Sequence, residues 1–136
     1  MNFTTEEQVM FFDTDIGGVV HNIAYLRMIE TCRTRLAEEF GFDLKEMADT
    51  QVYPVVVRTE IDYRKSATLG DFLLISGKLE EYSRSSFWCD FEVRNKLLPE
   101  TLYITCRQKL AVVQMPQARP VRLPKHVLAS FEGAIG

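Results

Sequence analysis

The sequence predicts an α+β protein in which an antiparallel sheet of about five strands packs against one long helix. Helical spacing of apolar residues is concentrated in residues 22–40, whereas several later segments show strand-like alternation. The segments between those strands are short, which suits antiparallel neighbours and not the long crossovers of a parallel sheet. The 136 residues are expected to form a single domain, 1–136, with its own core.

The N-terminal part of the chain predicts a strand, a turn and the long helix. Residues 5–12 (TEEQVMFF) form the first expected strand, and DTDIGG at residues 13–18 is rich in turn formers. Gly41 follows the expected helix, at a position where a left-handed residue commonly ends a helix. The apolar positions recur at spacings of three and four, as one buried helix face requires, at Leu26, Ile29, Cys32, Leu36 and Phe40.

The rest of the chain predicts four further strands. The clearest two-residue alternation runs from Phe87 to Val93, where apolar residues alternate with Trp88, Asp90, Glu92 and Arg94. Turn-forming segments separate the strands, and helical character returns near residues 124–131. The other expected strands cover residues 55–63, 72–79 and 101–114, with turns at 67–71, 81–86 and 95–100.

Composition excludes several classes of function. The net charge of −3 offers no basic field for nucleic acid or an anionic membrane. Three cysteines without paired spacing argue against a disulfide framework, and two distant histidines argue against a zinc site. The sequence shows neither a signal peptide nor an apolar run of membrane-spanning length. We therefore expect a reduced, cytoplasmic protein without a metal.

The segment from Phe12 to Arg33 carries the candidate chemistry. Asp13 and Asp15 lie in a Gly-rich turn just before the helix. A helix N-terminus has unpaired N–H donors and about half a positive charge, which suits an oxygen that becomes negative during acyl transfer. A carboxylate beside these donors is able to attack a carbonyl or to activate water. Spacing alone favours a simpler interpretation, because Asp is also a common capping and turn residue.

The same segment resembles the hot-dog thioesterases of the 4-hydroxybenzoyl-CoA thioesterase type, including the Tol-Pal-associated acyl-CoA thioesterases. Their signature reads approximately D-x-D-x-x-G, followed by a Val, a polar-aromatic stretch, Tyr-Leu and a helix with Glu and Arg. Later segments around Ile61–Asp71, Phe87–Val93 and Arg119–Pro124 also fit, so the resemblance spans nearly the whole chain. The matching residues are Asp13, Asp15, Gly18, Val19, Val20, Tyr25, Leu26, Glu30 and Arg33.

The resemblance implies a hot-dog fold and assigns roles by position. Asp15 matches the catalytic carboxylate, acting either as nucleophile or as general base. Gly18 would let the backbone approach the substrate, and the backbone N–H of Asn22 would polarise the thioester carbonyl. Asp13 is expected to organise the turn. His21 is a further catalytic candidate that would orient water or line the acyl pocket, although a partly buried, hydrogen-bonded histidine is the favoured interpretation.

Other residues are expected to bind the substrate. Tyr25 and Arg64 are candidates, together with Arg84, Ser85 and Ser86, which match positions that contact the pantetheine arm or nucleotide in the family. Basic side chains would bind the phosphates of CoA, although for each residue taken alone a solvated surface charge is the favoured interpretation. Further candidates for the phosphates are Lys65, Arg119 and Arg122. The three cysteines are expected to be buried and inert, and Glu30 to pair with Arg27 or Arg33.

Three functions remain open at this stage. The first is hydrolysis of an acyl-CoA thioester to acid and CoA, without a cofactor. For this function the resemblance implies a homodimer or homotetramer whose site lies between protomers. The second is a hydratase or dehydratase acting on acyl thioesters, for which His21 is the one candidate base near Asp15. The third is a non-catalytic module that binds acyl-CoA or an acyl carrier.

Overall fold

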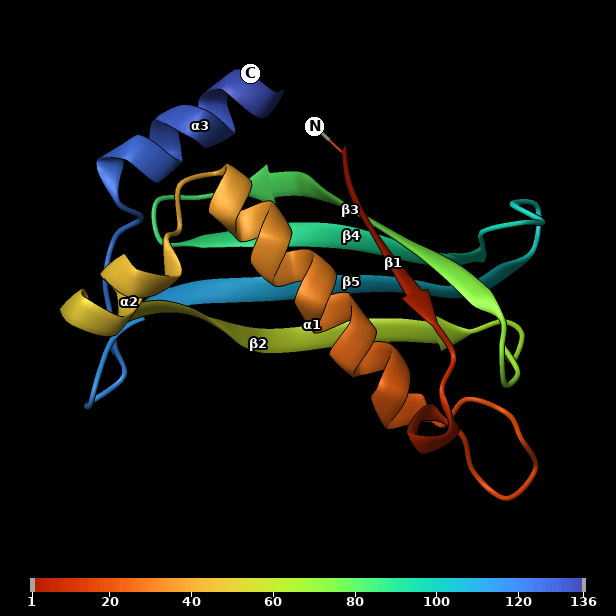
Figure 1. The fold of residues 1–136 in the computed structure, drawn as a ribbon. Coiled ribbons are helices and arrows are strands. Elements are labelled where there is room, and N and C mark those ends of the chain that lie inside the picture. The colour runs from red at the N-terminus through yellow and green to blue at the C-terminus, as the bar shows by residue number, and fades with distance from the viewer. Residues whose placement is uncertain (1, 136) are drawn as a thin grey trace.

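The computed structural model describes residues 2–135, which form one twisted antiparallel sheet crossed by a long helix (Figure 1). The strand order is β1-β3-β4-β5-β2, and the short β6 pairs with β5. The strands are β1 (Asn2–Gln8), β2 (Val52–Tyr63), β3 (Phe72–Tyr82), β4 (Ser86–Asn95), β5 (Leu102–Gln114) and β6 (Arg119–Pro120). The helices are α1 (Asn22–Glu39), α2 (Leu44–Thr50) and α3 (Lys125–Ile135), with one 3₁₀ turn at Phe11–Asp13.

The predicted antiparallel α+β architecture is confirmed. All paired strands are antiparallel, and consecutive hairpins join β3, β4 and β5. The long helix begins at Asn22 as expected, Phe40 is its C-cap, and Gly41 follows with a φ of +105°. The second edge of the sheet is β2, which pairs with β5 and with no other strand of residues 2–135.

Two parts of the N-terminal half differ from the sequence-based expectation. The first strand ends at Gln8, and Phe11–Asp13 form a 3₁₀ turn, so the expected strand over residues 5–12 is wrong in its second half. The turn forms because the buried carboxylate of Asp13 accepts the backbone N–H of Met10 at 2.9 Å. The short helix α2 was not predicted. The Asp43 carboxylate begins it by accepting the N–H of Glu46 at 3.0 Å, a capping signal that was present in the sequence.

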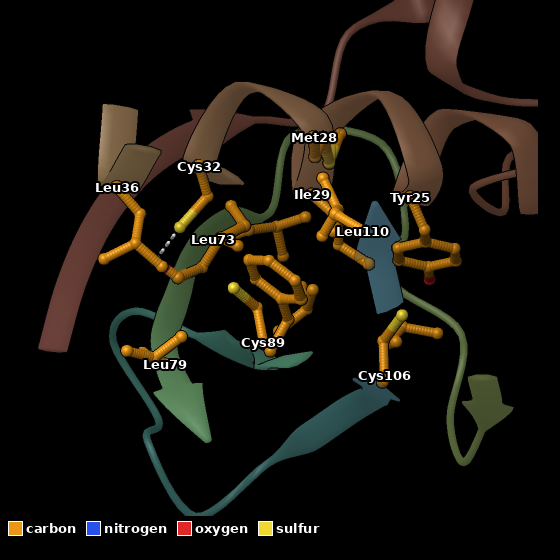
Figure 2. Packing of buried hydrophobic residues seen from close by; sticks show 14 of the residues in the cluster. Tyr25, Met28, Ile29, Cys32, Leu36, Leu73, Leu79, Cys89, Cys106 and Leu110 are labelled. Carbon is orange, nitrogen blue, oxygen red and sulfur yellow. Dashed lines mark hydrogen bonds between the residues drawn. The ribbon is translucent and has the colours of Figure 1, made fainter. Parts of the chain in front are cut away.

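The core lies between α1 and the inward face of the sheet. Figure 2 shows Met28, Ile29 and Cys32 pointing from the helix toward side chains of the strands. Fully buried residues of α1 and of the strands form one continuous cluster, which α3 extends with Val127 and Phe131. Burial of this face holds α1 across the sheet and so sets the position of its N-terminus.

The two ends of the sheet carry different loops (Figure 1). The N-terminus of α1, the loop that precedes it and residues 64–71 lie at one end, and the β3–β4 turn and α3 lie at the other. Between these ends runs β3, whose 11 residues span about 35 Å at about 3.3 Å per residue. Among the helices of residues 2–135, none is long and apolar enough to cross a membrane.

Candidate active site

Asp15 begins the tight turn that separates β1 from α1. The turn closes because the N–H of Asp15 donates to Val19 at 3.1 Å and the N–H of Gly18 donates to the Asp15 carbonyl at 3.0 Å. Gly18 has a φ of +73°, a conformation that L-residues with a side chain rarely adopt. The Asp15 side chain is exposed, and its Oδ1 accepts the N–H of Gly17 at 3.0 Å. The second carboxylate oxygen accepts no hydrogen bond from the described part of the chain, residues 2–135.

The neighbouring acid, Asp13, is buried and hydrogen-bonded to the backbone on both sides of the turn. Its side chain is 3% exposed and accepts the Met10 N–H, while its carbonyl accepts the N–H of His21 at 3.0 Å. These bonds tie the start of α1 to the chain just before Asp15. The expectation that Asp13 organises the turn agrees with these contacts.

His21 caps the helix, as the favoured interpretation of a hydrogen-bonded histidine predicts, and this contact speaks against a catalytic role. Its Nδ1 accepts the N–H of Ala24 at 3.1 Å, so the ring carries its proton on Nε2, which donates to the Phe12 carbonyl at 3.1 Å. Both ring nitrogens are occupied by backbone groups. A histidine held in this way has no lone pair or proton free for water or substrate, and the cap instead stabilises the start of α1.

The first backbone amides of α1 are open to a ligand. The N–H of Ala24 is taken by His21, but residues 2–135 provide no acceptor for the N–H groups of Asn22 and Ile23. Both residues are exposed, and they carry the positive end of the helix dipole. The expected donor, the N–H of Asn22, is thus available for an oxyanion.

Tyr25 lies in the core, which speaks against its predicted contact with the substrate. The side chain is 2% exposed, and its hydroxyl oxygen accepts the N–H of Ala67 at 2.8 Å. Burial raises the pKa of the phenol above its usual value, because the phenolate would lose its hydration. A residue enclosed in this way holds elements of its own chain together and offers no surface to a substrate.

The remaining substrate-binding candidates fall into two groups. Arg64 is exposed at the end of β2, on the same end of the sheet as Asp15, and donates from Nε to the Thr105 hydroxyl at 3.2 Å. Arg84 and Ser85 lie in the β3–β4 turn at the opposite end, and Ser86 begins β4 there (Figure 1). One protomer therefore does not bring them together with Asp15.

The structure adds an apolar surface around the candidate site. Phe11, Phe12, Ile16 and Ile23 are 82%, 77%, 108% and 68% exposed, and all flank Asp15 along the chain. We call these four side chains the apolar rim. The strand predicted over residues 5–12 includes Phe11 and Phe12, so the sequence gives no sign that these two residues are exposed. So many exposed large side chains in one short segment are typical of a surface that is covered by a partner or a ligand.

The cysteines are unsuited to nucleophilic catalysis. All three are buried and free, as predicted. Burial raises the pKa of the Cys89 and Cys106 thiols to about 12, so neither is a thiolate at neutral pH.

Two further expectations concern charged and metal-binding groups. The expected ion pair between Glu30 and Arg33 forms at 3.6 Å. Within residues 2–135, no group of three His, Cys, Asp or Glu side chains is arranged to hold a metal ion.

Comparison with known proteins gives one consistent result. Residues 9–131 match the thioesterase-like superfamily. An acyl-CoA thioesterase YbgC from Haemophilus influenzae is 33% identical, over 95% of this chain and 93% of the relative. A 1,4-dihydroxy-2-naphthoyl-CoA thioesterase from Synechocystis superposes with a TM-score of 0.85, 24% identity and coverage of 96% of this chain and 95% of that one. A Staphylococcus aureus protein solved with CoA reaches a TM-score of 0.90 at 16% identity, covering 98% and 84% of the two chains.

Proposed function

Because the chain belongs to the thioesterase-like superfamily, we propose that it hydrolyses acyl-CoA thioesters, with Asp15 as the catalytic carboxylate. The resemblance noted in the sequence and the predicted hot-dog fold agree with this membership. The observation that carries the assignment of Asp15 is its exposed carboxylate, which has a free oxygen and lies in the turn leading to a helix whose first amides are open.

The chemistry follows from these two features. The thioester carbonyl oxygen accepts the open N–H groups of Asn22 and Ile23, which stabilise the negative charge that develops on it. Asp15 either attacks the carbonyl carbon, forming an anhydride that water then cleaves, or removes a proton from the attacking water. In both routes the C–S bond breaks, the thiolate of CoA leaves and takes up a proton, and the free acid remains.

A second protomer is needed to complete the site. The outer edge of β2 pairs with no strand of the described residues 2–135, and two such edges joined antiparallel about a two-fold axis would make one continuous sheet. That rotation sets the Arg84 end of one protomer beside the Asp15 end of the other. The partner's Arg84, Ser85 and Ser86 would then bind the CoA portion of a thioester whose carbonyl lies at Asp15, and the apolar rim would be covered.

We further propose a homodimer that forms the functional unit, with a homotetramer as a dimer of dimers, in the cytoplasm. The reaction as written needs only side chains, backbone amides and water, so no cofactor or metal takes part. Arg64, on the Asp15 end of the sheet, is a candidate for the phosphates of CoA.

The reaction is tested by incubating the protein with a panel of aliphatic and aromatic acyl-CoAs while measuring free thiol and acid together. Equal release of both products supports hydrolysis. Loss of acyl unsaturation without thiol release would instead indicate a hydratase, a function that the occupied ring of His21 disfavours. Tight binding without any product would indicate a binding module.

A further inference from the structure

Residues 67–71 form a backbone template against which the Asp15 turn is built. The N–H of Val20 donates to the Ala67 carbonyl at 2.9 Å, and the N–H of Leu69 donates to the Gly18 carbonyl at 3.1 Å. Val19 and Thr68 form an isolated β-bridge between these bonds. The turn that carries Asp15 therefore has its C-terminal arm paired with the segment joining β2 to β3.

Tyr25 holds this template from the side of the core. Ala67 is fully buried, and its N–H donates to the Tyr25 hydroxyl at 2.8 Å while its carbonyl receives the N–H of Val20. The backbone of Ala67 thus connects the Tyr25 side chain of α1 to the turn that carries Asp15. The Tyr25 ring itself is fixed by packing, with the ring of Tyr63 at 6.1 Å between centroids.

Asp71 holds the other end of the template. Its Oδ2 accepts the N–H and the hydroxyl of Thr68 at 2.9 and 3.2 Å, and the hydroxyl of Tyr103 donates to the same oxygen at 3.3 Å. Asn95 donates in turn to the Tyr103 hydroxyl at 2.9 Å. The template is therefore fixed at two points by buried or half-buried side chains, whereas the turn that it supports is exposed.

We propose that Tyr25 is a positioning residue for the hydrolytic reaction, because its hydroxyl sets the template and thereby the place of Asp15 relative to the open amides of α1. This inference rests on the proposed function. Tyr25 touches no substrate, so it acts on the geometry of the reacting groups and leaves the CoA-binding surfaces unchanged. A displacement of catalytic groups by about 1 Å can cost on the order of a hundredfold in rate.

The test compares Tyr25→Phe with the wild-type protein and with Asp15→Asn, using thiol release from one acyl-CoA. Tyr25→Phe keeps the ring and removes only the acceptor of the Ala67 N–H. We expect kcat to fall by about tenfold to a hundredfold with KM nearly unchanged. Amide hydrogen exchange at Val20 and Ala67 should become faster, while amides in the β4–β5 ladder keep their protection.

Val127→Ala is the matched control for lost stability, since Val127 is fully buried in α3 at the far end of the sheet. It should lower Tm without lowering kcat. Asp71→Ala, which releases Thr68 from the second fixed point, should reproduce the selective loss of kcat and keeps the test valid if Tyr25→Phe folds poorly.

An unchanged kcat in Tyr25→Phe, or an equal loss of kcat in Val127→Ala at the same loss of Tm, would overturn the inference. Neither result would affect the proposed function, which fails separately if Asp15→Asn keeps full activity.

Discussion

Gly77 of β3 packs directly against the ring of Phe91, its cross-strand neighbour on β4. A Cβ at residue 77 would come within 2.8 Å of the Phe91 ring and 3.2 Å of the Cys32 sulfur. The absence of a side chain here lets the middle of α1 lie close to the sheet. Because α1 carries the open amides at its N-terminus, this contact also determines where the candidate site is placed.

Gly77→Ala should therefore destabilise the protein. The added methyl group must displace Phe91 or the helix, and overpacking of a core typically costs about 1–3 kcal/mol. The free energy of unfolding, measured in urea, checks this. Gly133→Ala is the control, because Gly133 lies in α3 with open space around its Cα and should gain helix stability. Equal effects of the two changes would contradict the packing argument.

Much of this arrangement is readable from the sequence, because the periodicities are local. The spacing of apolar residues between Leu26 and Phe40 predicts α1, and the alternation from Phe87 to Val93 predicts β4. The Asp15 turn was identified from turn-forming residues and from a family resemblance. The missed helix α2 is short and has no buried residue, so its one signal was the Asp43 cap.

What the sequence could not show are relationships between distant residues. Tyr25 lies on the apolar face of a helix, but the acceptor role of its hydroxyl depends on Ala67, 42 residues away. The family resemblance implies that Arg84 binds the same substrate as Asp15, whereas the length of β3 separates the two residues within one protomer. The sequence favours a hydrogen-bonded His21, but it does not show that both ring nitrogens bind backbone groups, at Ala24 and Phe12.

Substitution of His21 distinguishes a residue that only caps the helix from one that acts as an acid or base in the reaction. His21→Asn keeps a side-chain acceptor suited to an N-cap, so we expect most of the activity and stability to remain. His21→Ala leaves the Ala24 N–H without its side-chain acceptor and should cost about 1 kcal/mol. Thermal unfolding and thiol release of both variants check this. Loss of activity in His21→Asn with normal stability would show that the ring itself takes part in the reaction.

The outer face of the sheet carries a carboxylate cluster around Arg107. Its guanidinium lies 2.9 Å from Glu80 and 3.0 Å from Glu60, over the ring of Trp88, but 3.6 Å from Asp90. Oδ1 of Asp90 is buried and has no hydrogen-bond partner among residues 2–135. Burial, together with the adjacent Glu80, raises the pKa of Asp90 to about 6.

The raised pKa of Asp90 gives a pH dependence with a definite sign. The native state binds a proton here more tightly than the unfolded chain, so this contribution to stability is present at low pH and is lost as pH rises through about 6. Asp90→Asn should match the wild-type protein at about pH 3, below the ordinary Asp pKa of 3.8, and exceed it by about 1 kcal/mol at pH 8, since water screens much of the effect. Urea unfolding at both pH values checks this. A difference independent of pH would contradict it.

The shared site predicts complementation between two defective variants. Asp15→Asn and Arg84→Glu are each expected to be impaired as homodimers. A mixed dimer has one site with both defects and one site with neither, so random mixing should restore about a quarter of wild-type activity. Thiol release is measured after the two variants are unfolded together and refolded. No recovery above the sum of the separate variants would show that each site is built from a single protomer.

The most direct test of the account is the rate of thiol release by Asp15→Asn. The Asn side chain can still accept the Gly17 N–H, so the turn should keep its shape and Tm should stay close to wild type. Asp49→Asn, the same change at an exposed residue of α2, is the matched control and should be fully active. We expect kcat of Asp15→Asn to fall by about a hundredfold or more. A folded Asp15→Asn protein with wild-type kcat would contradict the assignment of the catalytic carboxylate.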